Sequence, residues 1–126
     1  MAVSGAIPQL RTTDLERSID FYVDTVGLRL EFRHSDFYAG IEAGDQSFHL
    51  KLVDDPDPSI GYVAAEGHLH LYLTTDDARA EAARLQAQAV PLGAPVADTD
   101  WGTREFWIRD PDGHVLYYGE RLAGAA

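Results

Sequence analysis

An internal repeat constrains the fold of this chain more than any other feature of the sequence. Thr12-Thr13-Asp14 recurs as Thr74-Thr75-Asp76, about half the chain further along. Each copy follows a short run with the composition of a strand and opens a segment whose apolar residues recur at helical spacing. The repeat therefore predicts two similar units, each beginning with a strand and a helix.

Each unit is expected to start with its strand, over residues 6–11 in the first unit and 68–73 in the second. The first helix is expected over 14–26, where Thr13 and Glu16 have the spacing of a capping box and Gly27 follows. The second helix is expected over 77–89, with Ala78, Ala82, Leu85 and Ala89 as its apolar stripe and Pro91 as its stop.

Strand signals follow each helix. In the first unit they cover residues 28–33, 37–42 and 47–53; in the second, after an irregular connection at 91–102, they cover 104–109 and 114–119. The sequence thus predicts an α+β fold of two tandem βαβββ modules, whose curled mixed sheets carry a helix on one face and enclose a cavity on the other. We expect one domain over 1–126, with a first module at 5–53, a linker at 54–66 and a second module at 67–120.

Charge and composition exclude several classes of protein. The net charge of −11 repels phosphate backbones, so no nucleic-acid partner is expected, whereas cationic ligands are attracted. No apolar run is long enough to span a membrane, and the first residues lack the pattern of a signal peptide. The absence of cysteine rules out disulfides and thiolate metal sites. Together these features predict a cytoplasmic protein without a membrane partner.

Three motifs, in order, carry a resemblance to a known family. Residues 7–22 followed by Val26-Gly27-Leu28 form the first, Asp110-Pro111-Asp112-Gly113 the second, and residues 101–106 the third. They resemble the glyoxalase/bleomycin-resistance/dioxygenase, or vicinal-oxygen-chelate, superfamily, and the third is similar to its bleomycin-resistance branch. The resemblance covers nearly the whole chain. It implies a homodimer, and Pro8 within the first strand agrees, because that strand is then expected to lie at a sheet edge or to cross to a partner.

Catalytic members of the family hold a divalent metal with side chains from four strands. The resemblance puts these positions at Ile7, at Lys51 with His49 as the alternative, at His68 and at Tyr117. Only His68 is a standard ligand, and the Lys51 ammonium repels a cation, so no metal cofactor is expected. An atypical site of His49, His68 and His70 that binds zinc, nickel, iron or manganese stays open.

Strand alternation and the motifs together predict a pocket for a small molecule. Trp101 lies in an irregular, glycine-flanked segment, where binding residues concentrate. Arg104 and Glu105 form either an anchoring pair beside the pocket or an exposed salt bridge. The predicted ligand-binding residues are Gln9, Tyr38, His49, Lys51, His68, His70, Tyr72, Trp101, Arg104, Trp107 and Tyr117.

These observations favour a non-catalytic protein that sequesters an aromatic or cationic compound, including antibiotics, as bleomycin-resistance proteins do. The first alternative is a metal-dependent lyase or dioxygenase with the atypical histidine set. The second is a metal-free enzyme with His68 or His70 as general base and Tyr117 as acid. The last alternative is a structural or regulatory domain without any ligand.

Overall fold

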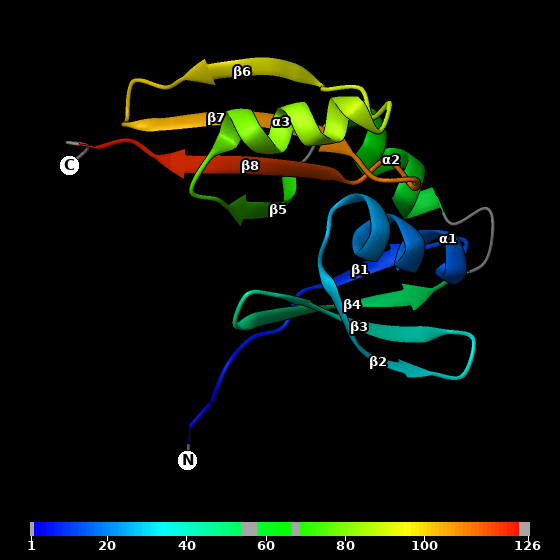
Figure 1. Cartoon of the computed structure of the whole chain (residues 1–126). Helices are drawn as coiled ribbons and strands as arrows, with labels where there is room; N and C mark the ends of the chain where they lie inside the picture. The colour runs from blue at the N-terminus through cyan, green and yellow to red at the C-terminus, as the bar shows by residue number, and fades with distance from the viewer. Residues whose placement is uncertain (1, 54–57, 67–68, 124–126) are drawn as a thin grey trace. The chain divides into compact units, whose positions relative to one another are not determined.

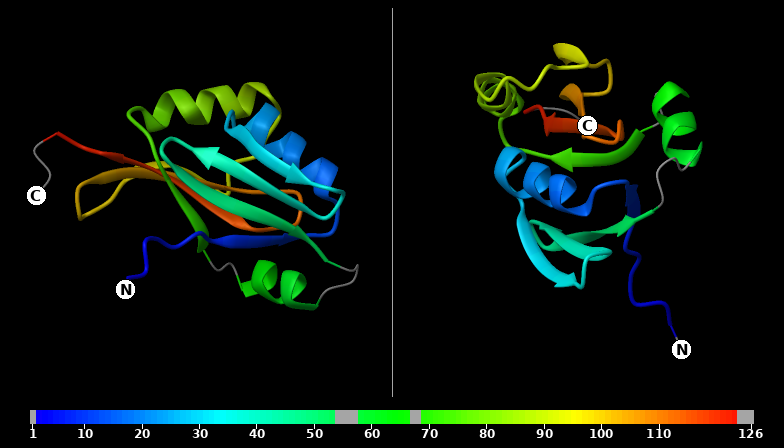
Figure 2. Two further views of the ribbon diagram at one scale, coloured as in Figure 1. Left: turned by 90° about the horizontal axis from the view of Figure 1, so that it is seen from below. Right: turned by 90° about the vertical axis from the view of Figure 1, so that its right-hand side faces the viewer.

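The computed structural model describes residues 2–53, 58–66 and 69–123, and divides into two compact units, Met1–Gly61 and Tyr62–Ala126. Each unit contains one four-stranded mixed sheet and a helix packed against one face of it, as Figures 1 and 2 show. The predicted order β-α-β-β-β is therefore confirmed in both units. In the described part of the chain, no helix is both long and apolar enough to cross a membrane.

The first sheet has the strand order β1-β4-β3-β2. β1 runs parallel to β4, and the other pairs are antiparallel. The elements are β1 (Gln9–Thr12), α1 (Leu15–Asp20), the π-helical turn η1 (Phe21–Thr25), β2 (Arg29–His34), β3 (Tyr38–Ala43) and β4 (Gln46–Leu52).

The second sheet repeats this arrangement with the order β5-β8-β7-β6, and β5 runs parallel to β8. Between the sheets in sequence comes a further helix, α2, which straddles the boundary of the units. The elements are α2 (Pro58–Glu66), β5 (Leu69–Thr74), α3 (Ala78–Ala87), β6 (Ala94–Asp98), β7 (Thr103–Arg109) and β8 (Val115–Arg121).

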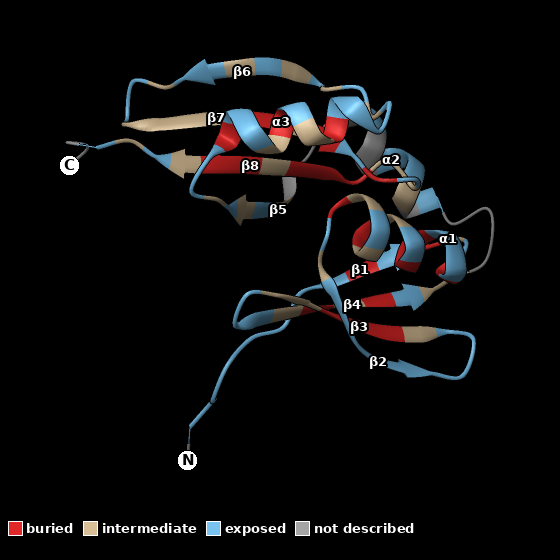
Figure 3. Cartoon of the chain, in the orientation of Figure 1, coloured by how far each residue is buried: buried red, intermediate tan, exposed pale blue. Residues whose placement is uncertain are grey.

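Each unit buries its core between the helix and one face of its sheet (Figure 3). Ile41 and Leu50 are fully buried on the α1 side of the first sheet, and Phe106 and Leu116 hold the corresponding places on the α3 side of the second. Because side chains alternate along a strand, the residues between these buried positions point to the opposite face. Several residues of that opposite face, such as His49, Lys51 and Tyr117, stay partly or fully exposed.

The residues that cap the helices differ from those predicted. The capping box at Thr13 and Glu16 was wrong, since Asp14 is the N-cap of α1 and its Oδ1 accepts from the backbone N–H of Arg17 at 3.0 Å. In α3 the equivalent N-cap is Asp77, which accepts from Ala80 at 2.9 Å. The structural equivalence of the units is therefore Asp14 with Asp77, one residue out of step with the repeated Thr-Thr-Asp.

Other boundaries also differ from the expectation. The first helix changes to a π-helical turn at Phe21, and α3 ends before Ala89, which is exposed and has a positive φ of 62°. Pro91 is therefore not what stops it. β6 lies inside the connection expected to be irregular, and α2 occupies the second part of the expected linker. Pro8 precedes β1 instead of lying within it, but β1 is an edge strand as predicted.

Candidate functional site

Three aromatic side chains lie on neighbouring strands of the second sheet, on the face opposite α3, which we call the ring face. Tyr72 of β5 and Trp107 of β7 are both in register with Tyr117 of the central β8. The rings of Tyr72 and Tyr117 are 6.4 Å apart at 10°, and those of Trp107 and Tyr117 are 6.4 Å apart at 25°. The three predicted residues therefore form one nearly parallel series of rings.

Two of these rings lie flat against the backbone because glycines stand beneath them. A Cβ on Gly119 would be 1.8 Å from the Tyr72 hydroxyl oxygen, and a Cβ on Gly93 would be 2.2 Å from the indole of Trp107. Any other residue at these positions would displace the ring above it. The glycines therefore keep the aromatic layer close to the sheet and leave space above it.

A pocket of about 640 Å³ opens at one end of the ring face. Trp101, in the turn between β6 and β7, borders it from one side and is 69% exposed. Tyr72 borders it with 43% of its surface exposed. The full lining consists of Tyr72, Thr74, Thr75, Asp76, Trp101, Gly102, Thr103, Gly119 and Arg121.

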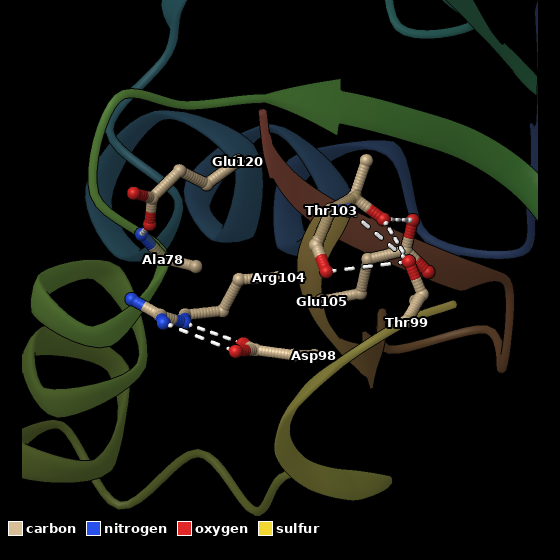
Figure 4. Close-up of polar contacts among 7 residues, drawn as sticks. All are labelled: Ala78, Asp98, Thr99, Thr103, Arg104, Glu105 and Glu120. Atoms are coloured by element: carbon tan, nitrogen blue, oxygen red, sulfur yellow. Dashed lines mark hydrogen bonds and ion pairs between the residues drawn. The ribbon is translucent and has the colours of Figure 1, made fainter. Parts of the chain in front are cut away.

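A chain of hydrogen bonds anchors Tyr72 at the pocket, and Figure 4 shows its part on β7. The Tyr72 hydroxyl donates to Oε2 of Glu105 at 2.5 Å, and the Thr103 hydroxyl donates to the same oxygen at 2.8 Å. The Oγ1 atoms of Thr99 and Thr103 are 2.8 Å apart. Desolvation, reinforced by the hydrogen bond to Glu105 and its negative charge, raises the pKa of Tyr72 to about 12. The phenol is therefore a hydrogen-bond donor at neutral pH.

Arg104 lies on the other side of the sheet from these rings. It alternates with Glu105 along β7, and its Nε donates to Asp98 Oδ1 at 2.7 Å (Figure 4). This hydrogen bond lowers the pKa of the Asp98 carboxyl. On the same side, Glu120 accepts from the backbone N–H of Ala78 at 2.9 Å, at the start of α3. Arg104 and Glu105 thus have different partners and do not act as a pair.

In the first unit, the structure brings together three of the predicted residues on the face opposite α1. Gln9 Nε2 donates to the Tyr38 hydroxyl at 3.2 Å, and that hydroxyl is 2.8 Å from Nδ1 of His49. Lys51 is exposed and in register with Tyr38. Phe32 closes the group, because its ring lies over Gly40, where a Cβ would be 2.3 Å away.

The described residues do not supply a metal-ligand set. Among residues 2–53, 58–66 and 69–123, no group of three or more His, Cys, Asp or Glu could hold a metal ion. Ile7 precedes β1 and is exposed, and Tyr117 lies between two rings. His68 lies outside the described residues, and only the backbone of His70 is described, so the three-histidine site stays a prediction.

Several residues of the pocket in the second unit and of the group around Tyr38 and His49 in the first unit were not among the predicted ones. Gly119 and Arg121 share the face of Tyr117 by simple alternation along β8, so this signal was present in the sequence. Phe32 was within a predicted strand, but a bulge between Leu30 and Phe32 hides its orientation. Asp76 belongs to the repeated Thr-Thr-Asp and Thr103 to the third motif, but neither pattern indicates a pocket; only the folded chain brings them to it.

The two four-stranded mixed sheets, each with one helix packed on one face, define the class of protein: an α+β protein of two βαβββ modules. The particular family follows from the comparison with known families. Residues 6–118 match the model of the glyoxalase/bleomycin resistance protein/dioxygenase superfamily, and the chain belongs to that family.

Similar proteins within this family include both binders and an enzyme. The antibiotic-binding protein TnmS3 from Streptomyces sp. CB03234 is 31% identical, with a TM-score of 0.71 over 96% of this chain and 98% of that one. The bleomycin-binding protein of Streptomyces verticillus, solved with copper(II)-bleomycin, is 26% identical, with a TM-score of 0.69 over 98% of each chain. A lactoylglutathione lyase from Haemophilus influenzae is 27% identical over 88% of this chain and 87% of its own.

Proposed function

We propose that this protein sequesters a small aromatic or cationic compound, without transforming it, in the pocket of the second unit. The observation that carries the proposal is that two large, exposed aromatic side chains, Trp101 and Tyr72, border one pocket of about 640 Å³. Pockets of roughly 300–1,000 Å³ lined by aromatic groups and a few polar ones are typical of sites for drug-sized ligands.

The chemistry of the lining favours binding by stacking and hydrogen bonding. A planar ring placed against Trp101 or Tyr72 gains burial of apolar surface together with about 0.5–1.5 kcal/mol from aromatic contact. Thr74, Thr75 and Thr103 offer hydroxyl groups at the rim. Tyr72 is held protonated in its bond to Glu105, so it serves as a fixed wall and not as a base. These features support recognition without requiring a chemical step.

Charge extends the proposal to cationic ligands. Asp76 lines the pocket together with Arg121, so the attraction comes mainly from the net charge of −11 of the whole chain, which raises the local concentration of cations. The exposed indole of Trp101 adds a cation–π surface. A bleomycin-binding relative at 26% identity and an antibiotic-binding relative at 31% identity agree with a ligand of this kind.

Tryptophan fluorescence tests the proposal directly, because the two tryptophans of the chain, Trp101 and Trp107, both belong to the second unit. Titration with metal-free bleomycin and with other aromatic cations is expected to change the emission saturably for at least one compound. Trp101→Ala is expected to weaken that binding about tenfold, or roughly 1.4 kcal/mol, while Trp107 still reports it.

Tyr62→Ala is the matched control, since Tyr62 is a 67% exposed aromatic on α2 outside the pocket. It is expected to leave the affinity unchanged. No saturable change with any compound of the panel, or an unchanged affinity in Trp101→Ala, would contradict the proposal.

A metal-dependent enzyme is the second candidate, and the 27% identity to a lactoylglutathione lyase is the observation that favours it. Its ligands would be His49, His68 and His70. Metal analysis of protein purified without a metal-affinity tag separates the two candidates. Stoichiometric metal in the wild type that is lost in His68→Ala would favour the enzyme over the binding protein. Metal-free protein that binds an aromatic cation supports the binding protein.

A further inference from the structure

We infer that the first unit holds a second recognition site, in which the Nε2–H of His49 donates to an oxygen acceptor, a carbonyl or a carboxylate, on an aromatic ring. The inference goes beyond the pocket of the second unit and does not depend on it. It rests on the direction of the hydrogen bonds that run through Gln9, Tyr38 and His49.

We assign the direction from the protons available and from the lengths of the two contacts. A phenol has a single proton, and the Tyr38 oxygen already accepts from Nε2 of Gln9 at 3.2 Å. We place the phenol proton in the shorter of the two contacts, 2.8 Å to Nδ1 of His49, so that Nδ1 is the acceptor. A neutral imidazole that accepts at Nδ1 carries its own proton on Nε2. Gln9 thus sets the tautomer of His49 through Tyr38.

Packing fixes the orientation of the imidazole as well as its tautomer. The ring of Phe32 meets it edge-on with centroids 5.1 Å apart at 86°, and the ring of Tyr38 meets it at 5.2 Å and 76°. Phe32 is itself held flat over Gly40. Since Phe32 is 36% exposed and His49 only half-buried, a ligand can reach both the apolar ring and the imidazole.

The surroundings favour an acceptor over a donor. Lys51, the one lysine of the chain, lies two residues from His49 on the same face and is exposed. Two acidic side chains on the strands of this sheet have partners of their own: Glu42 binds Arg29 at 2.9 Å, and Glu31 accepts from Ser47 at 2.7 Å. A carbonyl or carboxylate oxygen therefore meets donors here, and the aromatic part of such a ligand has Phe32 beside it.

The same tautomer disfavours metal binding by His49. Histidine ligands usually donate one ring N–H to a neighbouring acceptor and offer the other nitrogen's lone pair to the metal. Here Nδ1 accepts instead, so Nε2 has no lone pair to offer. The chain of hydrogen bonds would have to reverse before His49 joined a metal site.

Gln9→Glu tests the inference by reversing that chain with almost no change of shape. A carboxylate at this position accepts from the Tyr38 hydroxyl, so the phenol proton is no longer available to His49, and Nδ1–H of His49 is expected to donate to the phenol oxygen instead. Nitrogen-15 NMR of the imidazoles, with His49 assigned from the His49→Gln variant, is expected to show Nε2–H in the wild type and Nδ1–H in Gln9→Glu. A purely structural role of Gln9 would not exchange the tautomers.

Binding is measured on the full chain with benzoate and benzamide, which present a carboxylate and a neutral carbonyl on the same ring. Either probe is expected to shift the Nε2 signal of His49, and Gln9→Glu is expected to weaken the binding at least tenfold. Gln46→Glu, an exposed position on the same strand as His49, adds an equal charge and is expected to change the affinity less than about twofold.

Lys51→Gln separates the effect of charge from that of hydrogen bonding, since it is expected to weaken the binding of benzoate more than the binding of benzamide. An Nδ1–H tautomer in the wild type would overturn the inference. So would the failure of both probes to shift the Nε2 signal, or Zn²⁺ binding at His49 Nε2 in the wild type. The tryptophan signal belongs to the other unit, so the outcome here is read independently of the pocket at Trp101.

Discussion

Tyr72 shows how far a single side chain depends on its neighbours. Its hydroxyl donates to Glu105, and its ring lies over Gly119. Alternation along β5 predicts that Tyr72 faces the pocket, and this part could be read from the sequence. The anchoring could not, because Glu105 is 33 residues away along the chain. The sequence suggests Glu105 as a partner of Arg104, whereas the fold sends these two neighbours to opposite faces of β7.

The raised pKa of Tyr72 predicts a loss of stability at high pH. An unfolded tyrosine ionises near pH 10, whereas in the folded protein the pKa of Tyr72 is about 12. Folding therefore favours the protonated phenol, and its contribution, complete below pH 10, is lost as the pH rises from 10 to 12. The free energy of urea unfolding is expected to fall across this window, and to fall less in Tyr72→Phe.

Tyr118 provides the comparison, because burial raises its pKa to about 12 as well. Part of the loss is therefore expected to persist in Tyr72→Phe and to be reduced further in the double variant with Tyr118→Phe. An identical pH dependence in the wild type and in Tyr72→Phe would contradict the raised pKa.

At the scale of single elements, the N-caps decide where each helix begins. Asp14→Ala is expected to cost about 0.5–2 kcal/mol of the free energy of unfolding, because it leaves the backbone N–H of Arg17 without its side-chain acceptor. Asp77→Ala is expected to do the same in α3. Thr13→Ala, at the position favoured by the capping-box pattern, is expected to cost less. Urea unfolding measures all three, and a larger loss in Thr13→Ala would contradict the assigned cap.

The close contact between β5 and β8 predicts a second effect. Gly119→Ala is expected to destabilise the protein by about 1–3 kcal/mol, because the new Cβ displaces the Tyr72 hydroxyl from above the sheet. In a Tyr72→Ala background the same substitution is expected to cost much less, and a double-mutant cycle measures this coupling. Independent, additive losses would show that the two residues do not meet.

Gly61 is the matched glycine for this experiment. It lies in α2, and a Cβ there has nothing within 4 Å. Gly61→Ala is therefore expected to stabilise the protein by about 0.5–1 kcal/mol through its effect on the helix. A loss comparable to that of Gly119→Ala would indicate that the method reports a general intolerance of alanine.

For the whole molecule, the charge of −11 predicts that ionic strength distinguishes the two kinds of ligand. Salt screens the attraction between the acidic surface and a cation, with a Debye length of about 10 Å at 0.1 M. Raising NaCl from about 0.05 to 0.5 M is expected to weaken the binding of a cationic aromatic ligand several-fold. The binding of a neutral ligand is expected to change little. Titration calorimetry tests this, and equal weakening of both would indicate that charge plays no part in recognition.

Most of the architecture could be predicted, because it follows from local patterns. Two units, their strands and helices, and the family all came from alternation, helical spacing and ordered motifs, and the family model confirms the assignment. β6 was not predicted because Pro95 interrupts its pattern. α2 was not predicted because Pro56 lies just before it and its sequence, PSIGYVAAE, opens with a proline and contains a glycine. The homodimer and the sequestered ligand stay predictions.

The site was predicted less completely than the fold, for a physical reason. Alternation selects a face, and the two tyrosines that it assigned to one face, Tyr72 and Tyr117, lie side by side. Trp107, expected only as an aromatic near the mouth, lies beside Tyr117. It gives no information about turns, bulges or glycines under rings, and these decide the shape of the pocket and the position of Phe32.

The glycines beneath Tyr72 and Trp107 have a consequence for how ligand preference can change in relatives of this chain. A shorter side chain in place of Tyr72 would expose the backbone of Gly119 and remove the hydrogen bond that Tyr72 donates to Glu105. The strands therefore tolerate few substitutions at these positions. The turn that carries Trp101 has no such dependence, since its indole is largely exposed. New specificities should therefore arise by exchanging residues of that turn while the sheet beneath stays constant.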